Sequence, residues 1–233
     1  MFLQMSRIAI IAALPGELKP LVKGWRHERR DGVDLWRWKF DEGEWIAACA
    51  GAGVERARRA FLAAESDGPL TSVYSIGWVG ALSEECQPGM VYRVSGVIDA
   101  QTGVRFRPGQ WSEERWLVTT ARVADHEEKQ RLAESYGAAL VDMEAAAVAR
   151  LAAMRGIPFY GIKGVSDGFH ENLPDFNRFL DDEGQMRMGR LIVFALLHPR
   201  YWPALMRMGE NSKRAALAMA GELRNLLTAQ TAE

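Results

Sequence analysis

Hydrophobic residues in this chain gather in short runs separated by amphipathic stretches. Runs of mainly apolar residues bounded by Gly, Pro or Asp predict buried strands. Alternation over 34–40, the turn Asp41-Glu42-Gly43 and the returning run 44–50 predict a hairpin. Strands are therefore expected at 8–14, 34–40, 44–50, 72–77, 90–98, 116–120, around 141 and at 159–165. Helical spacing is found at 17–23, 54–65, 127–136, after Glu144, at 183–197, and over 201–227 as one or two helices. This order predicts an α/β fold with a mixed sheet flanked by helices.

Composition narrows the class of protein. The chain has 233 residues, 48% of them hydrophobic, and a formal net charge of −1. That length suits a single domain over 1–233, and the charge gives no indication of a nucleic-acid partner. Cys49 and Cys86 are far apart and predict free thiols, and the four histidines form no metal-binding motif. With no run of about 20 apolar residues and no secretory leader, a cytoplasmic protein is expected.

Two carboxylates follow predicted strands and are the first candidates for chemistry. Glu144 comes just after the run that ends at Val141-Asp142, and Asp167 follows the end of the run 159–165 by two residues. In open α/β sheets, ligands bind at the carboxyl ends of strands. Each acid also has an ordinary structural interpretation, because Glu144 begins a helix and Asp167 precedes a glycine that suits a turn. Because both acids follow successive strands, the functional interpretation is favoured for the pair, and the protein is predicted to be an enzyme.

Five motifs in order resemble the nucleoside phosphorylase/nucleosidase superfamily, nearest to the 5′-methylthioadenosine/S-adenosylhomocysteine nucleosidases. They are the strand from Ile8 followed by Leu14-Pro15-Gly16-Glu17, the turn Gly51-Ala52-Gly53, the segment 77–82 with 87–91 behind it, Val141-Asp142-Met143-Glu144-Ala145, and Val165-Ser166-Asp167. The resemblance covers residues 8 to about 195. It implies a three-layer α/β/α sandwich around a mixed, partly barrel-like sheet, no cofactor, and a homo-oligomer.

The same resemblance assigns roles to individual residues. Asp167 is expected to be the acid that protonates the departing purine, and Glu144 to accept hydrogen bonds from the ribose hydroxyls. Glu17 is expected to activate the attacking water, although a first-turn acid also suits a helix dipole. The remaining expected substrate contacts are Met143, Ser166, Trp78, Val79 and Gly80. The implied activity is hydrolysis of the N-glycosidic bond of an adenosine-type nucleoside.

Phosphate is the alternative nucleophile. Phosphorylases of this superfamily bind phosphate with arginines in the first loop and before the glycine-rich turn, where this chain has Glu17 and Ser75. A glutamate repels phosphate, which favours water. Arg56, Arg58 and Arg59 keep phosphorolysis open, although an arginine run on a helix is usually a solvated face.

Three departures from the family bear on the substrate. Trp78 replaces a small polar residue, Lys163 stands where an arginine is common, and the segment 120–141 is short. The basic amphipathic stretch 199–233 resembles the tail of hopanoid-associated members, which are implicated in releasing adenine from a lipid-linked adenosine. A weak membrane-surface contact is one interpretation of this tail, and a packed helix or subunit contact is the other. A non-catalytic nucleoside-binding protein with this fold is a further alternative.

Overall fold

A mixed sheet of eleven strands forms the centre of the computed structural model, which describes residues 6–40, 43–107, 115–171, 173–179 and 187–230. The strands are β1 (Ser6–Ala12), β2 (Arg26–Arg30), β3 (Val33–Phe40), β4 (Gly43–Cys49), β5 (Ser72–Ala81), β6 (Val91–Val94), β7 (Gly96–Asp99), β8 (Arg105–Phe106), β9 (Trp116–Thr119), β10 (Leu140–Asp142) and β11 (Phe159–Asp167).

Strand pairing makes β5 the centre of the sheet. The order is β2-β3-β4-β1-β5-β10-β9-β7-β8, and β11 lies beside β5 with β6 on its other edge. The first half of β5 pairs with β1, and its last two residues pair with β10. The described strands do not close into a barrel, because the path ends at β2 and β8. The predicted mixed α/β sheet is confirmed, whereas its barrel-like character is not seen in the pairing.

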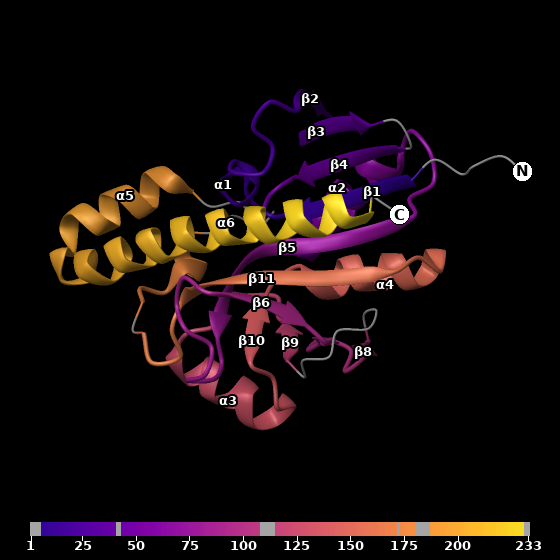
Figure 1. Cartoon of the computed structure of the whole chain (residues 1–233). Helices are drawn as coiled ribbons and strands as arrows, with labels where there is room; N and C mark the ends of the chain where they lie inside the picture. The colour runs from indigo at the N-terminus through magenta and orange to yellow at the C-terminus, as the bar shows by residue number, and fades with distance from the viewer. Residues whose placement is uncertain (1–5, 41–42, 108–114, 172, 180–186, 231–233) are drawn as a thin grey trace, which may run out of the picture.

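Helices cover both faces of this sheet (Figure 1). They are α1 (Pro15–Leu18), α2 (Val54–Glu65), α3 (His126–Tyr136), α4 (Ala145–Arg155), α5 (Met188–Leu197) and α6 (Trp202–Gln230), with two short 3-10 helices at Phe176–Phe179 and Pro199–Tyr201. The side chains of α2 and α4 enter one hydrophobic cluster, and those of α6 enter another. The three-layer arrangement is therefore confirmed. No helix in the described ranges combines the length and apolar composition that a bilayer crossing requires.

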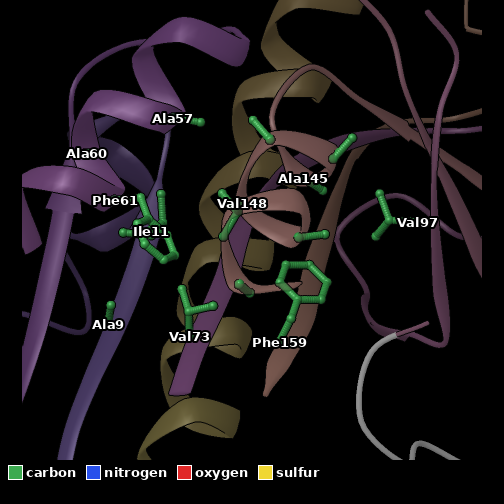
Figure 2. Close-up of a cluster of buried hydrophobic side chains, with 14 of the residues drawn as sticks. Ala9, Ile11, Ala57, Ala60, Phe61, Val73, Val97, Ala145, Val148 and Phe159 are labelled. Carbon is green, nitrogen blue, oxygen red and sulfur yellow. The ribbon is translucent and has the colours of Figure 1, made fainter. Parts of the chain in front are cut away.

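Alanine lets helices approach the sheet closely on one face. In α4, Ala145, Ala146, Ala149 and Ala152 are buried, and Phe61 of α2 fills the space between α2 and β1 (Figure 2). Burying apolar area at roughly 25 cal/mol per Å² is the main source of stability in such a layer. This packing fixes the start of α4, and with it the position of Glu144.

The opposite face is covered by one long helix. The tail predicted as one or two helices forms the single helix α6, which packs on β11. The fit is close, because a Cβ added at Gly164 would lie 2.6 Å from the Cβ of Ala215. Met219 and Leu223 of α6 are fully buried against this face. The strand that carries Asp167 is thereby held between two helical layers.

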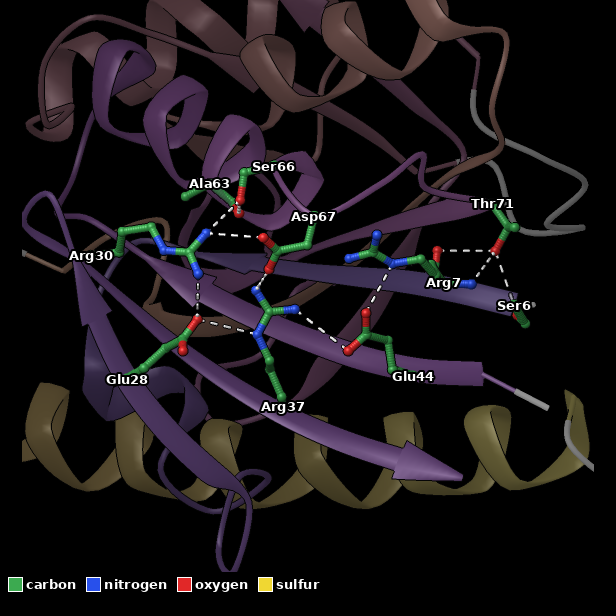
Figure 3. Close-up of polar contacts among 10 residues, drawn as sticks. All are labelled: Ser6, Arg7, Glu28, Arg30, Arg37, Glu44, Ala63, Ser66, Asp67 and Thr71. Atoms are coloured by element: carbon green, nitrogen blue, oxygen red, sulfur yellow. Dashed lines mark hydrogen bonds and ion pairs between the residues drawn. The ribbon is translucent and has the colours of Figure 1, made fainter. Parts of the chain in front are cut away.

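Strand β2 is a difference from the sequence prediction, which placed no strand between 14 and 34. Its sequence, Arg-His-Glu-Arg-Arg, carries no hydrophobic residue. It forms as an edge strand beside β3, where Glu28 pairs with Arg37 at 3.3 Å, within the polar network of Figure 3. Charged side chains are a common device at sheet edges, because they discourage pairing with another chain.

Smaller differences concern boundaries. The strand expected at 90–98 is divided at Ser95 into β6 and β7, which join different neighbours. The helix expected from 17 begins at Pro15 and ends at Leu18. The helix expected over 183–197 begins at Met188, and residues 183–186 lie outside the described residues.

Candidate active site

The three predicted carboxylates surround the C-terminal end of β5. The Trp78 N–H donates to Glu17, Gly80 lies opposite Asp167 in the β5–β11 register, and Val141 of β10 pairs with Gly80 two residues before Met143. The sheet therefore brings residues from three distant segments to one strand end. This is the edge at which α/β proteins bind ligands.

Glu17 is held by three backbone donors. Its Oε2 accepts from the N–H groups of Ala13 and Leu14 at 2.9 and 2.8 Å, and its Oε1 accepts from Trp78 at 2.8 Å. The side chain is only 3% exposed. Burial raises the pKa of Glu17 above its ordinary value, while these hydrogen bonds and the Lys163 charge lower it. The result is a rigidly oriented carboxyl group that is a stronger base when ionised.

Glu144 points back to the glycine-rich turn before α2. Its Oε1 accepts from the Gly53 N–H at 2.6 Å, and its Oε2 lies 3.3 Å from the Met143 N–H. Gly53 has a φ of 98°, a conformation that glycine adopts without strain. This geometry explains why a glycine-rich turn and a strand-end glutamate occur together: the turn presents an N–H group to the carboxylate.

A buried lysine lies among these acids. Lys163 of β11 is 1% exposed, and its Nζ lies 2.9 Å from Asp142 Oδ2 and 3.0 Å from Ser75 Oγ. Its positive charge also lowers the pKa of both Glu17 and Glu144, against the raising effect of burial. Sequence reasoning missed Asp142 as a member of the site. The available signal was a lysine between Ile162 and Gly164 in a buried strand, since such a charge requires a buried partner.

Carboxylates outnumber cations in this group. Burial first, and then the neighbouring Asp142 carboxylate, raises the pKa of Glu144 to about 8, against the lowering effect of Gly53 and Lys163. The group therefore retains a proton near neutral pH, and Glu144 is the residue where it is favoured.

Asp167 belongs to a second group on the other side of β5. Its Oδ1 accepts from the Ser166 hydroxyl at 2.6 Å, and Ser166 Oγ also lies 3.2 Å from the Val79 carbonyl oxygen. Its Oδ2 lies 2.5 Å from Lys129 Nζ, which also donates to the Gly168 carbonyl at 2.7 Å. Lys129 comes from α3 and is 2% exposed. Sequence reasoning missed Lys129.

The other predicted contacts have mixed surroundings. Gly80 faces the second group, because a Cβ there would lie 3.1 Å from Lys129 Cε and 3.2 Å from Asp167 Oδ2. The Val79 side chain is in the core, whereas Met143 is half-buried beside Glu144. The indole N–H of Trp78 donates to the Ser212 carbonyl of α6 at 2.9 Å. These positions lie near the candidate site, and their contact with a substrate stays a prediction.

Two hollows adjoin this region. Asp167 and Lys129 line a cavity of about 50 Å³ between α3 and residues 173–177. A larger apolar groove of about 670 Å³ lies between α1, α5 and α6, and the Trp78 ring forms part of its wall. Phe176 and Met208 line both, so the two adjoin. Glu17 and Glu144 are not among the described residues that line either hollow, so a single cavity containing all three acids stays a prediction.

The arginines after Gly53 differ in their surroundings. Arg58 pairs with Glu55 at 2.6 Å on the surface, and Arg59 donates to the Asp31 carbonyl. Arg56 is buried, and its side chain lies against Gly51. Across the described ranges, no cluster of three His, Cys, Asp or Glu side chains is arranged to hold a metal ion.

Comparison with known proteins supports the motif analysis. The family model described as the phosphorylase superfamily matches residues 111–197. No curated protein sequence matches the chain.

Solved structures share the fold along nearly the whole chain. The 5′-methylthioadenosine nucleosidase of Arabidopsis thaliana is 16% identical, with a TM-score of 0.75 over 96% of this chain and 95% of that one. Futalosine hydrolase of Helicobacter pylori strain 26695 is 14% identical, with a TM-score of 0.71 over 96% and 98%. A putative 5′-methylthioadenosine/S-adenosylhomocysteine nucleosidase from Borrelia burgdorferi B31, bound to adenine, is 15% identical, with a TM-score of 0.71 over 95% and 99%.

The matched segment contains Glu144, Asp167 and the helix between them. The match to the phosphorylase superfamily model is confined to this part of the chain, and the solved structures show that the whole chain is similar to nucleosidases in fold.

Proposed function

We propose that this protein hydrolyses the N-glycosidic bond of an adenosine-type purine nucleoside and releases the free base. The observation that carries the proposal is the placement of Glu17, Glu144 and Asp167 around the end of β5. Cleaving this bond places positive charge on the sugar and negative charge on the base. Carboxylates suit the sugar side, and a proton donor is needed on the base side.

Each acid has a place in this reaction. Glu144 lies beside Met143 and accepts from ribose hydroxyls, replacing its present bonds to backbone N–H groups. Glu17, fixed by its three backbone donors, takes a proton from the attacking water. Asp167 faces the base, supported by Ser166 and Lys129. Family relatives whose structures carry nucleosidase names support the assignment.

The test is direct. The protein is incubated with adenosine and 5′-substituted adenosines in phosphate-free buffer, and free base is followed by chromatography. We expect base to appear without phosphate, and Asp167→Asn to reduce its release about 100-fold or more while the fold is retained. Full activity of this variant would remove Asp167 from the mechanism. Nucleoside binding without any base release would favour the non-catalytic alternative.

Phosphorolysis is a second candidate, and Arg56 is the observation that favours it. It is a buried arginine next to the glycine-rich turn, where helix N-termini commonly bind phosphate. Release of base only after phosphate is added, with ribose 1-phosphate as the other product, would establish phosphorolysis in place of hydrolysis.

The apolar groove favours a substrate with a hydrophobic 5′ substituent, such as a lipid-linked adenosine. Its volume is that of a typical ligand pocket, and most of its lining residues are apolar. Exposed apolar side chains continue from it along α5, where Leu196 and Leu197 are 66% and 71% exposed. Co-sedimentation with liposomes, compared with a chain ending near Leu197, tests membrane contact. A cytoplasmic location and a homo-oligomer complete the proposal, and size-exclusion chromatography with light scattering tests the latter.

A further inference from the structure

Helix α5 exposes apolar side chains where a surface helix normally exposes polar ones. None of its side chains that the structure describes is buried. Leu191 lines the apolar groove, and the ring centroids of Phe194 and Phe179 lie 5.2 Å apart, so this side of the helix faces inward. The other side is between 54% and 71% exposed and consists of Ile192, Val193, Leu196 and Leu197. These four residues are adjacent on the helix surface and form one apolar stripe.

The stripe belongs to a part of the molecule that projects from the sheet. Figure 1 shows α5 folding back along the start of α6, and both extend past the end of the sheet. Farther along α6, Met219, Leu223 and Leu227 are fully buried. That part of the helix is committed to internal packing. Exposed apolar side chains continue instead in the first two turns of α6, where Trp202 and Met206 are 47% and 67% exposed.

Basic residues accompany the apolar stripe. Between residues 187 and 209 the sequence has four arginines and no aspartate or glutamate, and the acidic residues 181–183 lie outside the described residues. The four are exposed, and they are Arg187, Arg190, Arg200 and Arg207. Arg207 has Glu171 as a partner at 3.5 Å. Tyr201 and Trp202 follow directly, and both residue types are enriched where protein meets lipid head groups.

The size and charge of this surface favour one kind of partner. The ten residues of α5 span about 15 Å, half of the roughly 30 Å of hydrocarbon in a bilayer, so the helix cannot cross. A short helix with an apolar side and basic flanks instead lies in the plane of an anionic membrane surface. A symmetric contact between two copies of α5 is disfavoured, because it would bring the same arginines together.

We propose that α5 and the first two turns of α6 form a docking surface for an anionic phospholipid bilayer. The apolar stripe enters the boundary between head groups and acyl chains, and the arginines contact the lipid phosphates. Each arginine near such a surface is worth about a 5-fold increase in affinity. The proposal assigns membrane contact to a defined element, and it holds whether or not the protein cleaves nucleosides.

The experiment measures binding of the full-length protein to vesicles by sedimentation. One set of vesicles is phosphatidylcholine alone, and the other is phosphatidylcholine and phosphatidylglycerol in equal amounts. We expect binding to the anionic vesicles to be at least about 10-fold tighter, and to weaken when NaCl is raised from about 0.1 to about 0.5 M.

A first pair of variants tests the apolar stripe. Leu196→Ser combined with Leu197→Ser removes apolar surface without changing charge, and we expect at least about a 10-fold loss of affinity for anionic vesicles. Met154→Ser is the control, because Met154 is 72% exposed on α4, which covers the opposite face of the sheet. It should leave vesicle binding unchanged.

A second pair tests the arginines. Arg190→Gln combined with Arg200→Gln should weaken binding to anionic vesicles by about 10-fold or more. Arg26→Gln combined with Arg29→Gln is the control, since it removes the same charge from two exposed positions on β2. We expect this control to bind within about 2-fold of wild type. Circular dichroism checks that each variant is folded.

Each other outcome overturns the proposal. No binding of the wild type to anionic vesicles would exclude a membrane contact. An equal loss in both arginine pairs would show nonspecific adsorption by net charge. If the leucine variant keeps vesicle binding and light scattering shows that it has lost an oligomeric contact, the stripe belongs to a second copy of the chain. The proposed function is tested separately, because vesicle binding is measured without turnover: docking without base release would contradict only the reaction.

Discussion

Two buried lysines in this protein each meet a carboxylate, and their surroundings differ in charge and access. Lys163 and Asp142 have side chains that are both 1% exposed, and Glu17 and Glu144 add negative charge nearby. Lys129 and Asp167 form a one-to-one pair at 3% and 12% exposure that borders a cavity. The first region has more carboxylates than cations, and the second is balanced.

The difference indicates where a proton is held in the free protein. Where acids outnumber cations, repulsion and burial together favour the neutral form of one acid, here Glu144. In the balanced pair, each charged group has one partner of opposite charge. Identical residue types thus serve different chemistry because the local count of charges differs.

Removing the central cation of the first region should have the largest effect. Lys163→Met leaves Asp142 without its cationic partner and beside Glu144, and breaking a buried pair in this way costs about 3–5 kcal/mol. Thermal denaturation followed by circular dichroism should show a fall in Tm of about 10 °C or more at pH 7. Lys23→Met changes an exposed lysine and is the control. An unchanged Tm would mean that this region does not depend on its cation.

The proton on Glu144 predicts a pH-dependent stability. Because its folded-state pKa, about 8, exceeds the ordinary 4.5, its contribution is fully present below pH 4.5 and is lost as pH rises to about 8. A tenfold difference in proton affinity between the folded and unfolded chain is worth about 1.4 kcal/mol, so the loss amounts to a few kcal/mol. Glu144→Gln cannot titrate and should raise Tm relative to wild type more at pH 8.5 than at pH 5. An equal difference at both pH values would contradict the assignment.

A methyl group placed in the second region should separate activity from stability. In Gly80→Ala, the new Cβ would lie 3.1 Å from Lys129 Cε and 3.2 Å from Asp167 Oδ2, so the pair must shift by a few tenths of an ångström. We expect about 1–3 kcal/mol of destabilisation and a larger proportional loss of base release than of stability. Gly221→Ala in α6 has no neighbour within 4 Å of its added Cβ and is the control.

The smallest effect is expected from the exposed ion pairs of Asp67 with Arg30 and Arg37. They show what an ion pair contributes when it is not buried. Asp67 accepts from Arg30 at 3.2 Å and from Arg37 at 2.5 Å, with its side chain 43% exposed (Figure 3). Exposed pairs contribute about 0–1 kcal/mol, so Asp67→Ala should cost less than about 1 kcal/mol in urea denaturation. The difference should shrink in about 1 M NaCl, where screening is strong. A loss that salt does not reduce would show that the network acts through packing.

Sequence patterns predicted the strands and the acids because both leave local signals. The apolar run of β1, the alternation of β3, and the strand ends near Glu144 and Asp167 are all visible within a few residues. β2 gave no such signal, because its five polar residues form a strand through pairing with β3.

The burial of Lys129 could not be predicted from the sequence for a related reason. A lysine between acidic and polar residues on a helix normally faces solvent, and only the tertiary position of α3 beside β11 buries it. Its pairing with Asp167 joins residues 38 positions apart, which no local pattern encodes. The charge balance of the site, and hence the assignment of its protons, required the structure.

Strand β5 pairs with β1, β10 and β11, and the candidate site lies around its end. Hydrogen exchange at the amides of such a doubly flanked strand requires both neighbours to separate, so they belong among the slowest-exchanging groups. Glu17 is tied to the same strand through Trp78. Heating should therefore abolish catalysis together with the cooperative loss of the whole sheet, and not at a lower temperature through early local opening.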